Sequence, residues 1–172
     1  MRRLWVMFLV TWLAVGLTLL TAGYIDTIYK LETAIGYLSR AQSTAFAEDM
    51  KSYIEEALRL IPESGNPVWI FPTERTDFTL IRSDLTSIVE RLEIISGINL
   101  DSPAYAQGLS DIRGKLAVVI LQLGEAMPYT LITPINITLA LIWLSIPYTT
   151  YRITTLINSR RNRHNLTEQD EN

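Results

Sequence analysis

The sequence predicts an all-α membrane protein in which two transmembrane helices flank an extracytoplasmic antiparallel helical bundle. The first observation behind this fold class is a pair of windows without any charged residue, between Arg3 and Asp26 and between Glu125 and Arg152. Each window exceeds the ~20 mostly apolar residues with which a helix crosses a bilayer. The second is that the charged region between them carries apolar residues at helical spacing. The third is that basic residues flank both windows on their outer sides.

The composition of the 172-residue chain narrows the classes of function. The chain contains no cysteine, which excludes disulfides, thiolate metal sites and thiol nucleophiles. Its one histidine, His164, lies in a polar tail and argues against histidine-based metal sites and acid–base catalysis. The formal net charge of -3 argues against nucleic-acid binding. We therefore expect no enzymatic activity, no metal, no cofactor and no nucleic-acid partner.

Residues 4–25 are the predicted first transmembrane helix, and residues 1–3 form a cytoplasmic N-terminus. The apolar stretch is longer than the core of a signal peptide, which spans ~7–15 residues, so we favour an uncleaved anchor. A signal peptide cleaved near Thr21 is the alternative. Ala14, Thr18 and Ala22 share one face of this helix, and such small residues let another helix approach closely. Ordinary membrane composition would explain these three residues equally well.

The predicted extracytoplasmic domain, residues 26–127, begins as a continuation of the first helix. No proline occurs before Pro62, so we expect a single helix from about residue 4 to about residue 61. A break near Ser43 and Thr44 is the alternative, and it would give a bundle of four helices instead of three helices plus an extended strap. We prefer the unbroken helix because neither proline nor glycine lies near Ser43.

Residues 62–73 are the predicted strap, which begins with a turn rich in Pro, Gly and Asn. Fully extended, these residues would span up to ~40 Å and could carry the chain back along the bundle. We expect Trp69 and Phe71 to bury their rings, either in the protein's own core, which we favour, or against a partner.

Two apolar seams predict the remaining helices of the bundle. Each seam alternates spacings of three and four residues, as in a heptad pattern. The two helices, over residues 74–97 and 103–127, are joined by a short loop, which favours an antiparallel hairpin. The seams consist of Phe78, Ile81, Leu85, Ile88, Leu92 and Ile95, and of Tyr105, Leu109, Ile112, Leu116, Val119 and Leu123.

Residues 128–151 are the predicted second transmembrane helix. We expect Pro128 and Pro147 to mark its ends and Pro134 to bend it. Asn136 is the one Asn, Gln or ionisable residue inside either apolar window. A polar side chain at that depth usually faces protein or water. The two interpretations are a helix–helix or ligand contact, and a hydrated position near the membrane surface.

The charges outside the apolar windows predict the orientation in the membrane. From Asp26 to Glu125 there are 15 Asp and Glu residues against nine Lys and Arg residues, whereas Arg2, Arg3 and Arg152 flank the windows. The tendency of basic residues to stay inside then places both termini in the cytoplasm, with residues 152–172 as a cytoplasmic tail.

The leading functional hypothesis is a multi-pass protein of the cell membrane that acts by protein–protein interaction, as an accessory or scaffolding subunit of a membrane assembly. Its expected partners are the lipid bilayer and other membrane proteins or further copies of itself. The candidate interaction residues are Trp69, Phe71, Asn136, Ala14, Thr18 and Ala22. Two alternatives remain: a ligand-sensing or binding module that signals through a partner, and a homo-oligomeric channel or transporter component.

Overall fold

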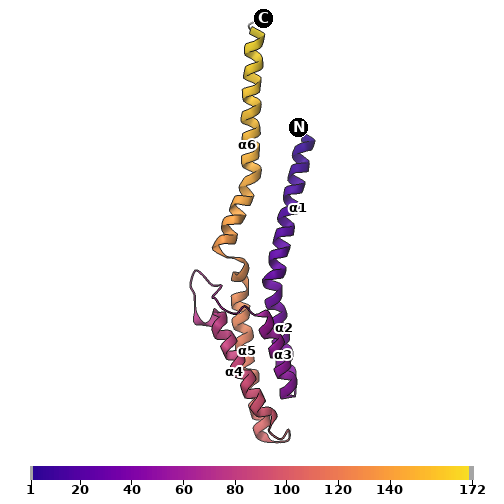
Figure 1. Cartoon of the computed structure of the whole chain (residues 1–172), viewed down its shortest axis with the longest axis vertical. Coiled ribbons are helices and arrows are strands. Elements are labelled where there is room, and N and C mark those ends of the chain that lie inside the picture. The colour runs from indigo at the N-terminus through magenta and orange to yellow at the C-terminus, as the bar shows by residue number, and fades with distance from the viewer. Residues whose placement is uncertain (1, 171–172) are drawn as a thin grey trace. The chain divides into compact units, whose positions relative to one another are not determined.

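The computed structural model describes the backbone of residues 2–170 and the side chains of residues 3–160. Over this part of the chain the protein is helical, without a β-strand, as predicted (Figure 1). The described chain contains six α-helices and one short 3-10 helix, η1, which lies between α3 and α4. In chain order the elements are α1 (Arg2–Asp26), α2 (Ile28–Ser43), α3 (Ala47–Leu60), η1 (Glu74–Thr76), α4 (Phe78–Ser96), α5 (Pro103–Leu131) and α6 (Pro134–Asp170).

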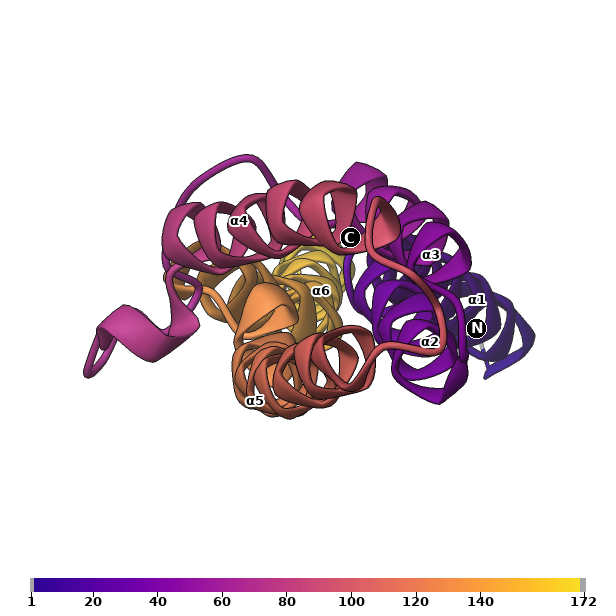
Figure 2. The same cartoon turned by 90° about the horizontal axis from the view of Figure 1, so that it is seen from below.

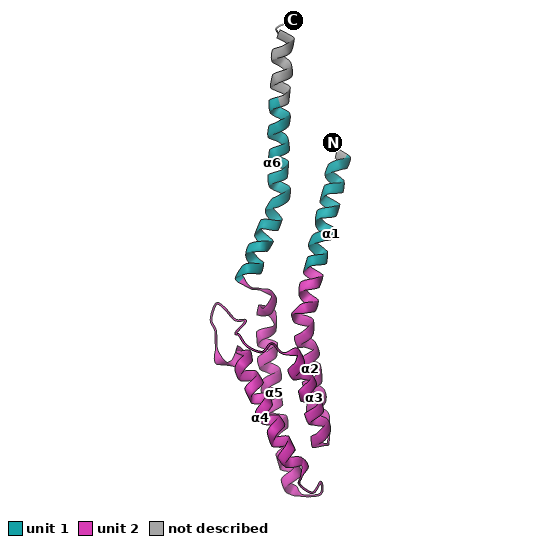
Figure 3. Cartoon of the chain, viewed as in Figure 1, with its two compact units in different colours: residues 1–19, 134–172 teal, residues 20–133 magenta. Residues whose placement is uncertain are grey.

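The chain divides into two compact units (Figure 3). One unit comprises residues 20–133 and holds the helices α2 to α5. The other comprises residues 1–19 and 134–172, and therefore holds most of α1 together with α6.

Residues 20–133 form an antiparallel four-helix bundle. Helix α2 packs against α3 and α5, and α4 packs against the same two helices, so that each helix lies beside its neighbours in the chain (Figure 2). Every residue of the two predicted seams is buried, which confirms both seams. The other apolar core residues are Leu31, Ala34, Leu38, Ala41, Ala47, Met50, Ile54, Ala57, Ile61 and Ala126.

The preferred expectation of one unbroken helix up to residue 61 is wrong, and the four-helix alternative is right. The backbone is extended at Thr44 and Phe46, between α2 and α3. Distant side chains satisfy the helix ends that this break exposes. Arg113 of α5 donates from Nε to the Gln42 carbonyl at 3.1 Å and from Nη2 to the Thr44 carbonyl at 2.7 Å. The Tyr105 hydroxyl accepts the Ala47 backbone N–H at 2.9 Å.

The predicted return strap is wrong for a related reason. Because α3 already runs back along α2, the segment between α3 and α4 has no distance to cover. Arg82, in the second turn of α4, donates from Nη1 to the carbonyls of Leu58 and Ile61 at 2.6 and 2.8 Å. These bonds place the end of α3 beside the start of α4. The intervening residues form a loop that closes on itself, with the Phe78 N–H donating to the Gly65 carbonyl at 3.0 Å.

The prolines near the second apolar window also occupy positions in the helices that differ from the predicted ones. Pro128 and Pro147 lie inside α5 and α6 rather than at helix ends. Pro134 does not bend a helix but begins one, because α5 stops at Leu131 and α6 starts at Pro134. Proline fits a first helical position well, since its missing N–H would have no partner inside the helix there.

In the second unit, α1 and α6 form an antiparallel pair. The rings of Trp12 and Trp143 stack with their centroids 5.8 Å apart, and Trp5 contacts Tyr151 edge-on at 6.0 Å. The Trp12 indole N–H donates to the Trp143 carbonyl at 3.3 Å. Gly16 makes room for this contact, because a Cβ atom there would lie 2.9 Å from Nε1 of Trp143.

Two helical runs, Arg3–Ser43 and Pro103–Arg160, each contain a stretch long and apolar enough to cross a membrane. None of the residues in these stretches is buried inside the protein. The apolar surface of α1 and α6 is thus left facing outward over most of its area. The tail that was predicted to be cytoplasmic continues α6 as far as Asp170, and its side chains beyond Arg160 lie outside the described residues.

Candidate functional site

The outward side of α5 carries an uncharged stripe, which we call the α5 outer face. It lies opposite the buried seam of the same helix, since the seam residues Leu116, Val119 and Leu123 are buried while every member of the stripe is exposed. Val118 and Leu121 provide its apolar side chains, and each is more than half exposed. The stripe consists of Gly114, Ala117, Val118, Leu121 and Gly124.

The glycines of α5 differ in what surrounds them. Gly108 packs against α4, where an added Cβ atom would lie 2.8 Å from Cδ1 of Ile95. Gly114 and Gly124 face open space, with no atom of the described residues within 4 Å of such a Cβ. Gly108 therefore serves the bundle itself. The other two cost helix stability without a compensating contact to the described residues.

The loop between α3 and α4 carries an apolar tip at residues 68–72. Trp69 and Phe71 do not pack in the core, contrary to our preference, because Trp69 is 43% and Phe71 80% exposed. The buried core contains the seam residues and neither of these two rings. Trp69 still has one fixed contact, since its indole N–H donates to the Ile132 carbonyl at 2.7 Å.

A network of hydrogen bonds holds the base of this loop. The Asn66 Oδ1 atom accepts from the Val68 N–H at 3.0 Å and from the Thr76 hydroxyl at 2.9 Å. The Asn66 Nδ2 atom donates to the Thr73 carbonyl at 2.7 Å. Thr76 is the one buried polar residue among the described side chains. The network pins the two ends of the loop together.

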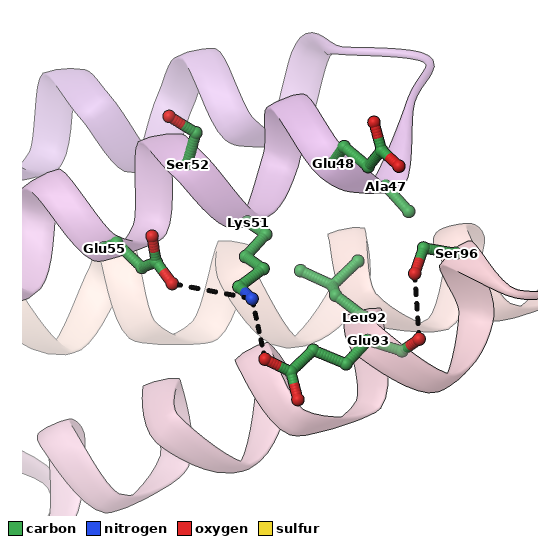
Figure 4. A pocket seen from close by; sticks show the side chains of 8 residues that line it. All are labelled: Ala47, Glu48, Lys51, Ser52, Glu55, Leu92, Glu93 and Ser96. Atoms are coloured by element: carbon green, nitrogen blue, oxygen red, sulfur yellow. Dashed lines mark hydrogen bonds and ion pairs between the residues drawn. The ribbon is translucent and has the colours of Figure 1, made fainter.

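A shallow hollow of about 330 Å³ lies between α3 and α4 (Figure 4). Lys51 extends from α3 toward α4, and its Nζ atom lies 2.6 Å from Glu93 Oε1 and 3.8 Å from Glu55 Oε1. The hydrogen bond to Glu93 raises the pKa of Lys51 above its ordinary value, with a smaller contribution from Glu55. The hollow is lined by Ala47, Glu48, Lys51, Ser52, Glu55, Leu92, Glu93 and Ser96.

The candidate residues in the apolar helices lie on exposed surface. Ala14, Thr18 and Ala22 are exposed, and the Thr18 hydroxyl donates to the Ala14 carbonyl of its own helix at 2.9 Å. The contact of α1 with α6 uses the face of Trp12 and Gly16 instead. Asn136 is exposed in the first turn of α6. The structure therefore does not bring the predicted residues together into one site.

Neither the α5 outer face nor the Trp12–Trp143 contact was identified from the sequence. The sequence signal for the α5 outer face is the helical spacing of the uncharged residues Gly114, Ala117, Val118 and Leu121. This spacing indicates an exposed face only when the opposite face of α5 is known to be buried. Among the described residues, no group of three or more His, Cys, Asp or Glu side chains is placed to hold a metal ion.

In comparisons with known proteins, no family model, no curated protein and no solved structure matches the chain.

Proposed function

We propose that this chain is an integral membrane protein that acts by protein–protein interaction, as an accessory or scaffolding subunit of a membrane assembly. The stretches of α1 and α6 that lack charge cross the bilayer, both termini lie in the cytoplasm, and the bundle of residues 26–127 lies on the other side. The outward apolar surface of α1 and α6 supports the membrane location, and the acidic balance of the bundle supports the orientation.

The α5 outer face is the observation that carries the interaction role. An uncharged helix face of small and apolar side chains suits close packing against another helix, as the α4–α5 contact at Gly108 illustrates inside the bundle. The charged residues Asp111 and Glu125 bound the face along the helix, so a docked helix would meet polar groups at the rim. The partner is another membrane protein or a second copy of this chain.

The decisive variant is Leu121→Glu, which places a charge in the middle of the α5 outer face. We expect the native complex, purified in a mild detergent, to lose its partner and run at the size of the free chain. The matched control is Ile94→Glu on α4, because Ile94 is also an exposed apolar residue of the bundle. A complex that survives Leu121→Glu, or is lost equally in Ile94→Glu, would count against this interface. Mass spectrometry of the complex separates self-association from a different partner.

The hollow at Lys51 favours the second candidate function, a binding module for a small polar ligand. Its polar groups converge from two helices, as a ligand site requires. However, Lys51 already pairs with Glu93, and a ligand would have to displace that contact. A Lys51→Met variant that keeps complex formation and loses binding of a small polar ligand in a calorimetric screen would favour this role over scaffolding.

A further inference from the structure

The loop between α3 and α4 exposes an apolar tip that the proposed interaction through α5 does not use. Residues 64–73 carry no charge, whereas Glu63 and Glu74 flank them. Within this run, Trp69, Ile70 and Phe71 are consecutive and exposed. Exposed apolar residues that occur singly are ordinary, but a contiguous group marks an interaction surface.

The loop is built to hold this tip in place. Asn66 and Thr76 tie its base together through side-chain hydrogen bonds, and Arg75 forms an ion pair with Glu125 of α5 at 3.1 Å. Trp69 is fixed by its bond to the Ile132 carbonyl. Because the base is polar and tied, the apolar side chains can be presented outward without unravelling the loop.

Chain connectivity gives the position of the tip. Ile132 lies two residues before Pro134, the first residue of α6. Two residues span at most ~7 Å, so the Trp69 indole lies close to the point at which the chain enters the apolar helix. Where α6 crosses a bilayer, this point is at the boundary between lipid and water.

We propose that residues 68–72 insert into the lipid–water interface of the membrane that α1 and α6 cross. This inference rests on the membrane location given under the proposed function. Tryptophan favours the interface because its ring is apolar while its N–H needs a hydrogen-bond partner, which Ile132 supplies here. Ile70 and Phe71 add apolar side chains that lipid can cover. The loop thereby becomes a second anchor and limits how far the bundle can tilt.

The absence of cysteine from the chain allows a direct test with single-cysteine variants of the full protein. We would reconstitute Ile70→Cys, labelled with an environment-sensitive fluorophore, into phosphatidylcholine–phosphatidylglycerol vesicles that contain nitroxide-labelled lipid. Leu100→Cys, in the loop between α4 and α5, is the matched control, because Leu100 is 58% exposed and Ile70 is 53% exposed. Val10→Cys in α1, where Val10 is 61% exposed, reports insertion of the protein itself.

We expect lipid-borne nitroxide to quench the label at residue 70 several-fold more than the label at residue 100, and nearly as much as the label at residue 10. Quenching at residue 10 together with equal, weak quenching at residues 70 and 100 would overturn the inference and leave the membrane location standing. No quenching at residue 10 would overturn both. A label at residue 70 that is shielded from aqueous iodide only in native membranes would assign the tip to a protein partner instead. Because the vesicles contain no other protein, a different membrane protein docked on α5 cannot cause the quenching.

Discussion

The bundle and the α1–α6 pair are both helical, but they place their apolar residues differently. Each bundle helix buries one seam, and all the buried apolar residues of the described chain lie between Leu31 and Ala126. The described side chains of residues 3–26 and 134–160 include none that is buried. The bundle thus hides its apolar surface within the chain, whereas α1 and α6 leave theirs exposed and are long and apolar enough to cross a bilayer.

The largest expected effect follows from truncating a seam residue. Leu116→Ala removes a fully buried side chain, and we expect a loss of about 2–5 kcal/mol in the free energy of unfolding. Leu13→Ala makes the same change on the exposed surface of α1 and should leave the bundle's unfolding unchanged. Denaturant unfolding in detergent, followed by circular dichroism, measures both. Equal losses in the two variants would contradict the contrast between the regions.

A charge in α6 should affect membrane insertion rather than folding of the bundle. An arginine near the centre of a transmembrane helix costs about 3 kcal/mol on insertion scales, so Leu141→Arg should reduce the integrated fraction of the chain. Ile94→Arg, on the exposed surface of α4, should have no such effect. Resistance to carbonate extraction from membranes measures integration. Full integration of Leu141→Arg would show that α6 does not cross the bilayer at this residue.

The turn between α2 and α3 should depend on a side chain far along the chain. Arg113→Met removes both donors to the Gln42 and Thr44 carbonyls, and we expect a loss of about 1–3 kcal/mol in the free energy of unfolding. Lys115→Met on the same helix is the control, because Lys115 is exposed and its side chain forms no hydrogen bond or ion pair with the described residues. If both variants unfold at the same denaturant concentration as the parent protein, the turn does not depend on Arg113.

The smallest effect concerns the ion pair in the hollow. The contact with Glu93 raises the pKa of Lys51, so its contribution to stability is present below the ordinary lysine pKa and is lost as the pH rises through the raised value. We expect the melting temperature of the parent protein to fall slightly more steeply than that of Lys51→Met between about pH 9 and pH 12. Parallel pH profiles for the two proteins would show that the pair contributes nothing to stability.

Sequence patterns predicted the parts of this structure that depend on local periodicity. The two seams follow directly from the spacing of apolar residues, and the apolar windows of α1 and α6 follow from the absence of charged residues. The break between α2 and α3 does not, because its hydrogen-bond partners, Tyr105 and Arg113, come from a helix 58 to 69 residues later. The acidic residues Glu48 and Asp49 in the first turn of α3 were a local signal of a helix start.

The candidate sites were harder to predict from the sequence, because the exposure of an apolar residue depends on how the rest of the chain packs around it. The aromatic residues Trp69 and Phe71 suggested burial, but the core was already complete without them. Likewise, the α5 outer face becomes visible only after the seam on the opposite side has been assigned.

The proposed membrane location is tested most directly by measuring the topology of the chain across a sealed membrane. Single cysteines at residues 100 and 159 would be exposed to a membrane-impermeant maleimide in intact cells, since Leu100 and Ser159 both have exposed side chains. The proposed topology predicts labelling of Leu100→Cys in intact cells, and of Ser159→Cys only after the membrane is permeabilised. Equal labelling of both variants in intact cells, or the reverse order, would contradict it.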